Sequence, residues 1–208
     1  MTRIAVIYYS SNGSNHAIAE AFATGAAEAG AEVRLRRAAE LAPAEVIERS
    51  ATWSAHLRAT EHIEIATPDD LVWADGIVLG APTRFGQPAA QLRQFMDTTS
   101  EVWGAGHLAG KPATGFTSSD ERHGGQEATL LALYHTLFHW GSIIVPTGYV
   151  DYDLSHAAGG NPYGVSAIVG DGPPDEQVLA LARYQAARLV TLAAALAPTR
   201  EMPEKVAG

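Results

Sequence analysis

The fold is decided by the stretch RIAVIYYSSNGSN, residues 3–15, where an apolar run passes through small polar residues into a helical pattern. Residues 3–9 are apolar almost without a break, which is typical of a strand buried on both faces of a sheet. From residue 14 to 29, apolar or small side chains recur at helical spacing, and Glu20 and Glu28 lie on the opposite side. The chain therefore begins with a strand, a polar loop and a helix.

The same alternation continues along the chain. The run Thr67-Pro68-Asp69-Asp70 predicts a helix start with an N-cap and a proline at the first helical position, and Pro88 and Pro173-Pro174 predict two more. Because each crossover helix must cover a face of the sheet, the pattern predicts an α/β fold with a five-stranded parallel sheet and helices on both faces. The five predicted strands are residues 3–9, 32–36, 76–80, 113–117 and 142–146.

Length and charge limit the possible functions. With 208 residues, 47% of them hydrophobic, the chain can bury one core and is short for two domains. We expect a single domain over residues 1–197 and a frayed tail over residues 198–208. The formal net charge of -9 opposes attraction to DNA phosphates and anionic lipid, so no nucleic acid partner is expected.

Two further features bear on location and redox chemistry. The apolar start is too short for an export signal. The most apolar late stretch, residues 178–196, contains Arg183, Gln185 and Arg188, so we expect an amphipathic surface helix and no membrane span. Without cysteine the chain has neither disulfides nor a thiolate, and any redox reaction needs a borrowed cofactor. These features fit a cytoplasmic protein.

The first polar loop, SSNGSN at residues 10–15, follows the first strand and opens a helix. A helix N-terminus offers free backbone N–H groups, hydroxyl and amide side chains can donate more hydrogen bonds, and Gly13 permits a tight bend. The loop has no basic residue and matches neither a Walker loop nor a dinucleotide GxGxxG motif. It predicts either a phosphate site built from neutral donors or an ordinary capped turn.

Two more loops follow strands at the same edge of the predicted sheet. The segment Pro82-Thr83-Arg84-Phe85 combines a cation with an aromatic ring, which suits a planar ligand with electron-rich oxygens. The loop at residues 117–130 adds Ser118, Ser119 and the pair Gly124-Gly125. Each loop alone can be an ordinary turn, but parallel strands bring all three together, where α/β proteins bind ligands.

Seven segments, taken in order and at their spacing, extend this interpretation to nearly all of residues 3–196. They are YYSSNGSNHAIAEA, GAPTRFGQPAAQLRQFMD, GKPATGFTSS, GGQEATLL, HWGSIIVPTGY, GGNPYG and ARYQ. Together they resemble the WrbA family of NAD(P)H:quinone oxidoreductases. The resemblance implies a flavodoxin-like fold, FMN as the cofactor, NADH or NADPH and a quinone as substrates, and a homotetramer.

The resemblance also implies roles for individual residues. The FMN phosphate would be held by Ser10, Ser11, Asn12, Gly13, Ser14 and Asn15. The isoalloxazine would be flanked by Pro82, Thr83, Arg84 and Phe85 on one side and by Ser118, Ser119, Asp120, Gly124 and Gly125 on the other. His139 would come to the flavin from another subunit and would be a candidate donor to the quinone oxygen. Trp103 would line the quinone and nicotinamide pocket together with Asn12.

Two departures from the family pattern affect these roles. The family's glycine-rich third loop is replaced by SSDERHGGQ at residues 118–126, which is one residue longer and charged. Asn12 replaces an aromatic residue that is common in relatives, which bears on nicotinamide stacking.

Alternative readings concern a metal and other functions. His135 and His139 are four residues apart, as zinc ligands on a helix are, but no third ligand follows by spacing, so we expect no metal. Read structurally, His139 is a helix C-cap and Trp103 is a core anchor. A flavodoxin-type one-electron carrier is the alternative function, and a regulatory partner of a DNA-bound repressor is a third reading that the charge disfavours.

Overall fold

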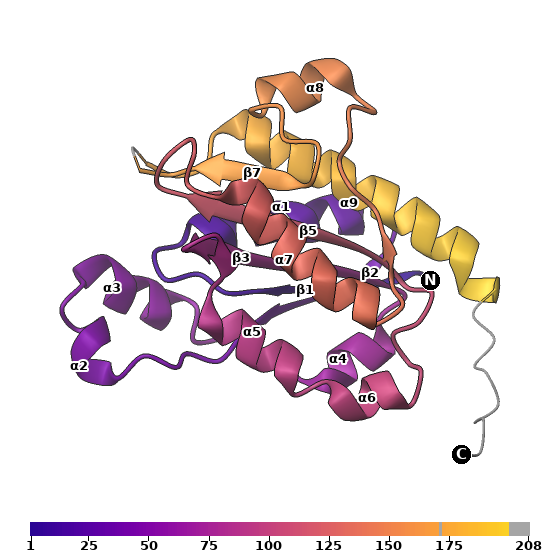
Figure 1. Cartoon of the computed structure of the whole chain (residues 1–208), viewed down its shortest axis with the longest axis horizontal. Coiled ribbons are helices and arrows are strands. Elements are labelled where there is room, and N and C mark those ends of the chain that lie inside the picture. Colours follow the sequence, from indigo (N-terminus) through magenta and orange to yellow (C-terminus); the bar gives the residue numbers. More distant parts are fainter. Residues whose placement is uncertain (171, 200–208) are drawn as a thin grey trace.

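The computed structural model describes residues 1–170 and 172–199, and these residues form an α/β structure with a central sheet between two layers of helices (Figure 1). The main path of the sheet runs β2-β1-β3-β5-β6, and every pair along it is parallel. Within the described residues the strands are β1 (Arg3–Tyr8), β2 (Glu32–Arg37), β3 (Gly76–Arg84), β4 (Gln87–Pro88), β5 (Pro112–Ser119), β6 (Ile143–Ile144) and β7 (Val165–Ile168).

The strand order reverses between β1 and β3, which is the topological switch point of this sheet. The helices that connect the strands are α1 (Ser14–Glu28), α2 (Ala44–Ile47), α3 (Ala51–Ala59), α4 (Pro68–Trp73), α5 (Ala90–Asp97), α6 (Ser100–Gly104), α7 (Gln126–His139) and α8 (Tyr152–Ala157). After the last strand come α9 (Glu176–Leu196) and the short 3-10 helix η1 (Ala197–Thr199). The predicted alternation of strands and helices is therefore confirmed.

Each face of the sheet has its own apolar core. On one face α1 and α9 pack together, with Phe22 of α1 stacked on Phe116 of β5 at 5.4 Å between ring centroids. On the other face α4, α5 and α7 cover the strands, with Leu92 and Leu130 fully buried. Strands β1 and β3 lie between the two cores, which is why their sequences are apolar on both sides.

The prediction of five strands is wrong, because the fifth position is divided and a hairpin strand is added. Strand β6 pairs with the start of β5, and β7 pairs with its end. Pro146 has no N–H to continue the hydrogen bonding to β5, and the chain leaves the sheet there. It returns at Gly164, which packs so closely on β5 that an added Cβ would lie 2.5 Å from the Gly115 oxygen. The intervening residues carry α8, which stands at the edge of the molecule (Figure 1).

Element boundaries differ from the sequence pattern between β3 and α5. Strand β3 extends through Arg84 and turns back as the antiparallel strand β4, so Pro88 lies in β4 and helix α5 begins at Ala90. At α4 the predicted capping box is confirmed: the Thr67 N–H donates to Asp70 Oδ2 at 3.0 Å.

The last helix carries the most apolar part of the chain. Among the described residues, 176–199 form a helical stretch with the length and composition that could cross a membrane. Its apolar stripe, which includes Leu181 and Leu189, is buried against α1 and the sheet, so packing accounts for that composition. The tail was predicted to begin at residue 198; Pro198 and Thr199 belong to η1, and residues 200–208 lie outside the described part of the chain.

Candidate functional site

The carboxyl ends of β1, β3 and β5 surround a cavity of about 320 Å³. It lies at the switch point, where the loops that follow these three strands converge. The cavity is lined by Ser10, Ser11, Asn12, Ser14, Asn15, Pro82, Thr83, Arg84, Phe85, Ser118, Ser119, Asp120 and Val169. The structure thus brings together residues from all three loops singled out in the sequence.

The first loop bends sharply into α1. Gly13 is the N-cap of α1 and has a φ of 99°, a left-handed conformation that favours glycine, and its N–H donates to Ser10 Oγ at 3.0 Å. The first intrahelical bond runs from the Ala17 N–H to the Gly13 oxygen, so the N–H groups of the first turn have no partners within the helix. This geometry offers an anion several donors and the positive end of the helix dipole.

Asn15 joins the first loop to the third. Its Nδ2 donates to Ser118 Oγ at 2.7 Å, and its side chain is almost fully buried. Among the described residues its Oδ1 is buried without a hydrogen-bond partner, and Asn15 is one of the residues that line the cavity. A buried unpaired amide oxygen costs free energy, which a ligand hydroxyl such as that of a ribityl chain would recover.

The β3–β4 turn forms a second wall of the cavity. Phe85 adopts φ 55°, which is rare for a residue with a side chain, and its ring is fully exposed. The Arg84 guanidinium donates to its neighbour's oxygen, Thr83 O, at 2.9 Å and to Ser11 Oγ at 3.4 Å. The strained turn therefore presents an unpacked aromatic ring and a cation side by side.

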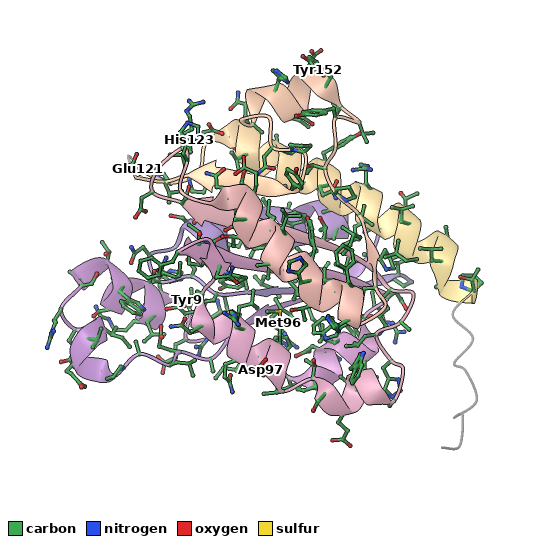
Figure 2. The ribbon with its side chains drawn as sticks, in the orientation of Figure 1. Tyr9, Met96, Asp97, Glu121, His123 and Tyr152 are labelled. Atoms are coloured by element: carbon green, nitrogen blue, oxygen red, sulfur yellow. The ribbon has the colours of Figure 1, made fainter. Side chains whose placement is uncertain are left out.

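The end of β5 forms the third wall. Ser119 Oγ bonds to Glu121 O and accepts from Gln126 Nε2, while Val169 N and Gly170 N donate to the oxygens of Ser119 and Asp120. These bonds fix the backbone at the point where the charged loop departs. Figure 2 shows Glu121 and His123 on the outer part of this loop, and of its charged residues only Asp120 lines the cavity.

Three predicted cofactor-site glycines lie beside the cavity and do not line its wall. Gly125, the N-cap of α7, packs against the β3–β4 turn, where an added Cβ would lie 3.1 Å from Gly86 Cα. An added Cβ at Gly124 would lie 2.6 Å from Ser119 Cβ. Like Gly13, these glycines let the loops around the cavity turn and approach one another.

His139 and Trp103 lie in a separate hollow of about 220 Å³ between α5, α6 and α7. Trp103 is half exposed, and its Nε1 donates to the His139 backbone oxygen at 2.7 Å. His139 is the last residue of α7. Within one chain, therefore, these two residues line a different hollow from the main cavity.

The segment between β2 and α4 contains a residue, Glu40, that supports the site and that the sequence pattern did not indicate. Glu40 accepts hydrogen bonds from Tyr9 Oη, Trp53 Nε1 and Gln91 Nε2 at 2.8 to 3.0 Å, and also from the N–H groups of the two residues that follow it. It thereby ties α3 and α5 to the end of β1, near the place where Figure 2 labels Tyr9. Burial raises the pKa of Glu40, but the hydrogen bonds outweigh it and lower the pKa below its ordinary value.

The polar cavity at the switch point thus combines the N-terminus of α1 with an exposed aromatic residue and a cation. This combination suits a planar ligand that carries a phosphate.

Comparison with known proteins places the chain more narrowly. The sequence profile of the NADPH-dependent FMN reductase family matches residues 2–156. A protein from Deinococcus radiodurans named NAD(P)H dehydrogenase (quinone) is 42% identical over 194 residues, which cover 93% of this chain and 96% of that protein. A protein of the same name from Geotalea daltonii is 41% identical over 95% of this chain and all of that protein. The chain belongs to the NADPH-dependent FMN reductase family, within its group of NAD(P)H dehydrogenases (quinone).

Solved structures agree on the fold. A flavodoxin, WrbA-like protein from Agrobacterium tumefaciens superposes with a TM-score of 0.64 at 24% identity, covering 94% of this chain and 99% of that one. An archaeal flavodoxin superposes with a TM-score of 0.61 at 16% identity. These likenesses concern the fold alone.

Proposed function

We propose that the protein catalyses the two-electron reduction of quinones to hydroquinones by NADH or NADPH, with FMN held in the cavity at the switch point. The observation that carries the proposal is that the first loop, the β3–β4 turn and the end of β5 all line one polar cavity. When bound, FMN supplies the chemistry of accepting two electrons from a reduced nicotinamide and passing them to a quinone.

The residues of the first loop bind the phosphate of the cofactor. Ser10, Ser11, Asn12, Ser14 and Asn15 contribute neutral donors, and the first turn of α1 contributes backbone N–H groups. Pro82, Thr83, Arg84 and Phe85 flank the ring system from one side, and Ser118, Ser119 and Asp120 flank it from the other. Gly13, Gly124 and Gly125 shape the loops that carry these contacts.

The two substrates use the same open side of the cavity in turn. The nicotinamide leaves before the quinone enters, so the kinetics are ping-pong. Initial rates measured over a grid of NADH and quinone concentrations should give parallel lines in double-reciprocal plots. Intersecting lines would show that both substrates bind together and would contradict this mechanism.

His139 and Trp103 complete the substrate side of the cavity from another copy of the chain in a homotetramer. The support is their position: both line a hollow apart from the main cavity, and the same chain exposes the apolar side chains Leu131 and Phe138 of α7 and Ile143 of β6. His139 would hold a proton for the reduced quinone oxygen. The variant His139→Ala should lower kcat for quinone while FMN stays bound, and unchanged turnover would remove this role.

A one-electron carrier is the alternative that the flavodoxin-like fold allows. The net charge of -9 suits basic redox partners, but the relatives at 41% and 42% identity are named as dehydrogenases. Stepwise photoreduction separates the two functions: an enzyme of the proposed kind should pass from oxidised to fully reduced without a one-electron stage accumulating. We place the reaction in the cytoplasm, since a chain without cysteine does not depend on an oxidising compartment.

A further inference from the structure

Three aromatic rings form a column behind the first loop, outside the cavity wall. The Tyr8 ring of β1 stacks on His16 of α1 at 5.3 Å between centroids, with 13° between the planes. The His16 ring lies 5.4 Å from the His56 ring of α3, measured between ring centroids. Tyr8 Oη and His16 Nε2 are buried, and neither has a hydrogen-bond partner among the described residues.

The column of aromatic rings lies next to the first loop at Gly13. His56 Nδ1 lies 3.5 Å from the position that a Cβ on Gly13 would occupy, and Gly13 is the N-cap of α1. His16 is the third residue of the same helix. His56 therefore lies beside the N-cap of α1, and His16 belongs to the first turn of that helix, whose N–H groups would face the cofactor phosphate.

The segment around α3 holds His56 in this place. Ser50 caps α3 by accepting from the Trp53 N–H, and the Trp53 indole donates to Glu40. Thr60, just after α3, is buried and donates to the His56 oxygen at 2.9 Å. These contacts give His56 a fixed position behind the loop.

Both histidines are poised to be neutral before a ligand binds. Burial lowers the pKa of His16; Glu20, whose Oε1 lies 3.5 Å from His16 Nε2, acts in the opposite sense, and His62 lowers the pKa further. Burial also lowers the pKa of His56, and His16 adds to this effect. The positive end of α1 disfavours a cation here as well.

The other charged groups around His56 come from β2 and the segment that follows it. Arg37 and Glu40 line a small space of about 20 Å³ behind the loop, together with His56, Tyr8 and Tyr9. Their opposite charges act against each other on the imidazole. Both tyrosines have a pKa raised chiefly by burial, so they stay neutral at ordinary pH.

A phosphate at the N-terminus of α1 changes this balance. Its second pKa lies near 6, so it carries close to two negative charges at neutral pH. These charges would offset the helix dipole and raise the pKa of the nearby imidazoles. If binding raises the pKa of one imidazole by one unit, the affinity for the phosphate is about tenfold higher at pH values below both pKa values than at pH values above both.

We propose that His16 and His56 form a proton-accepting pair that takes up a proton from solution when the phosphate of FMN binds, so that the protein distinguishes FMN from riboflavin by charge. The inference rests on the proposed function, because it assigns the phosphate to the first loop. The pair acts through the loop, and His16 and His56 are positioning residues with an electrostatic role. The proton comes from bulk solvent, and no other bond changes.

Calorimetric titration of the cofactor-free protein tests this proposal. FMN and riboflavin are titrated at pH 6.5 and pH 8 in buffers of different ionisation enthalpy, which gives the number of protons taken up. The wild-type protein is compared with His16→Gln, His56→Gln and the double variant. His107→Gln is the matched control, because His107 precedes β5 at the opposite edge of the sheet from the cavity.

The expected result is that wild type and His107→Gln take up a larger fraction of a proton per FMN at pH 6.5 than the double variant, whose value reports the proton that the phosphate itself loses, and take up none with riboflavin. Between pH 6.5 and pH 8, FMN affinity should fall in these two proteins by up to about tenfold more than it falls in the double variant. Equal proton uptake by the double variant, or equal uptake with riboflavin, would overturn the proposal. Binding of neither flavin would refute the proposed function itself.

A measurement on the wild type alone gives an independent check. Titration of the imidazole resonances by NMR, with and without FMN, should show the pKa of His16 or His56 rising on binding. If neither pKa moves, the imidazoles do not sense the phosphate.

Discussion

At the scale of single residues, Asp120 and Glu121 are neighbouring carboxylates with different surroundings. Asp120 lines the cavity, whereas Glu121 is not among its lining residues. Figure 2 labels Glu121 on the outer part of the loop. Because FMN carries a negative phosphate and gains electrons in the reaction, a carboxylate in the cavity wall opposes both its binding and its reduction.

The substitution Asp120→Asn should therefore strengthen FMN binding by about fivefold, or roughly 1 kcal/mol, the scale for a charge pair near water. It should also raise the two-electron midpoint potential by on the order of 20 mV. Spectroelectrochemistry and fluorescence titration measure the two quantities. Glu121→Gln is the control and should leave both unchanged; an equal effect of the two variants would mean that the wall carboxylate has no special influence.

Glu40 shows how one residue can support a site without lining its cavity. Two of its neighbours, Tyr9 and Trp53, both donate to Oε2, so an amide nitrogen at that position would face two donors. The variant Glu40→Gln should lower the free energy of unfolding by roughly 1–3 kcal/mol, as measured by denaturant titration. No loss of stability would mean that the carboxylate is dispensable.

The same carboxylate predicts a pH dependence. The pKa of Glu40 is lower in the folded protein than its ordinary value. Its contribution to stability is therefore fully present above the ordinary glutamate range and is lost as pH falls through the lowered folded-state pKa. Unfolding measured from pH 7 to pH 3 should show a shallower acid loss in Glu40→Gln than in wild type.

At the scale of elements, the closest helix contact is made by Gly25 of α1. A Cβ there would lie 2.5 Å from the Cα and O atoms of Arg183 in α9. A glycine-to-alanine change usually stabilises an exposed helix by about 1 kcal/mol, but here the backbone of α9 blocks the methyl group.

The variant Gly25→Ala should thus destabilise the protein, by roughly 1–3 kcal/mol, because α1 and α9 must move apart. Gly104 in α6 is the matched control: it has nothing within 4 Å of the added methyl group, and Gly104→Ala should be neutral or stabilising. Thermal unfolding compares the two. A stabilising Gly25→Ala would show that the helices are not in close contact.

Most elements follow from local sequence signals. The apolar run at residues 3–9 and the capping box at Thr67 predicted β1 and α4 because each signal is contained in a few neighbouring residues. The division of the fifth strand could not be predicted from local sequence. Strand β7 forms because Val165–Ile168 pair with the end of β5, from which they are far apart in the sequence. The turn at Phe85 could not be predicted either, because no local sequence signal marks an aromatic residue whose backbone adopts the left-handed conformation.

The site divides in the same way. Polar loops after predicted strands indicated the cavity-lining residues, since parallel strands place their carboxyl ends at one edge. The roles of Glu40 and His56 depend on contacts between segments far apart in the sequence, such as Gln91 with Glu40, and periodicity carries no information about them.

At the scale of the whole molecule, the exposed apolar side chains of α7 are the strongest reason to expect subunit contacts. Phe138 has an exposed fraction of 60% and directly precedes His139, which lines the hollow between α5, α6 and α7. A charged residue at an apolar contact costs several kcal/mol, enough to dissociate copies of the chain.

The variant Phe138→Lys should therefore sediment as a species smaller than the wild type and should lose quinone turnover while it still binds FMN. Leu192→Lys is the control, because Leu192 is also partly exposed but lies on α9, which covers the opposite face of the sheet. If Phe138→Lys remained the same size as wild type, α7 would not be the subunit contact.

We have proposed that the cavity at the switch point holds an FMN that transfers electrons from a nicotinamide to a quinone. The most direct measurement is an anaerobic absorbance experiment on the FMN-loaded protein, with NADH or NADPH added first and benzoquinone second. We predict that the nicotinamide bleaches the visible flavin band in one turnover and that the quinone restores it fully. A protein that binds no FMN, or whose bound FMN stays oxidised with both nicotinamides, would contradict the account.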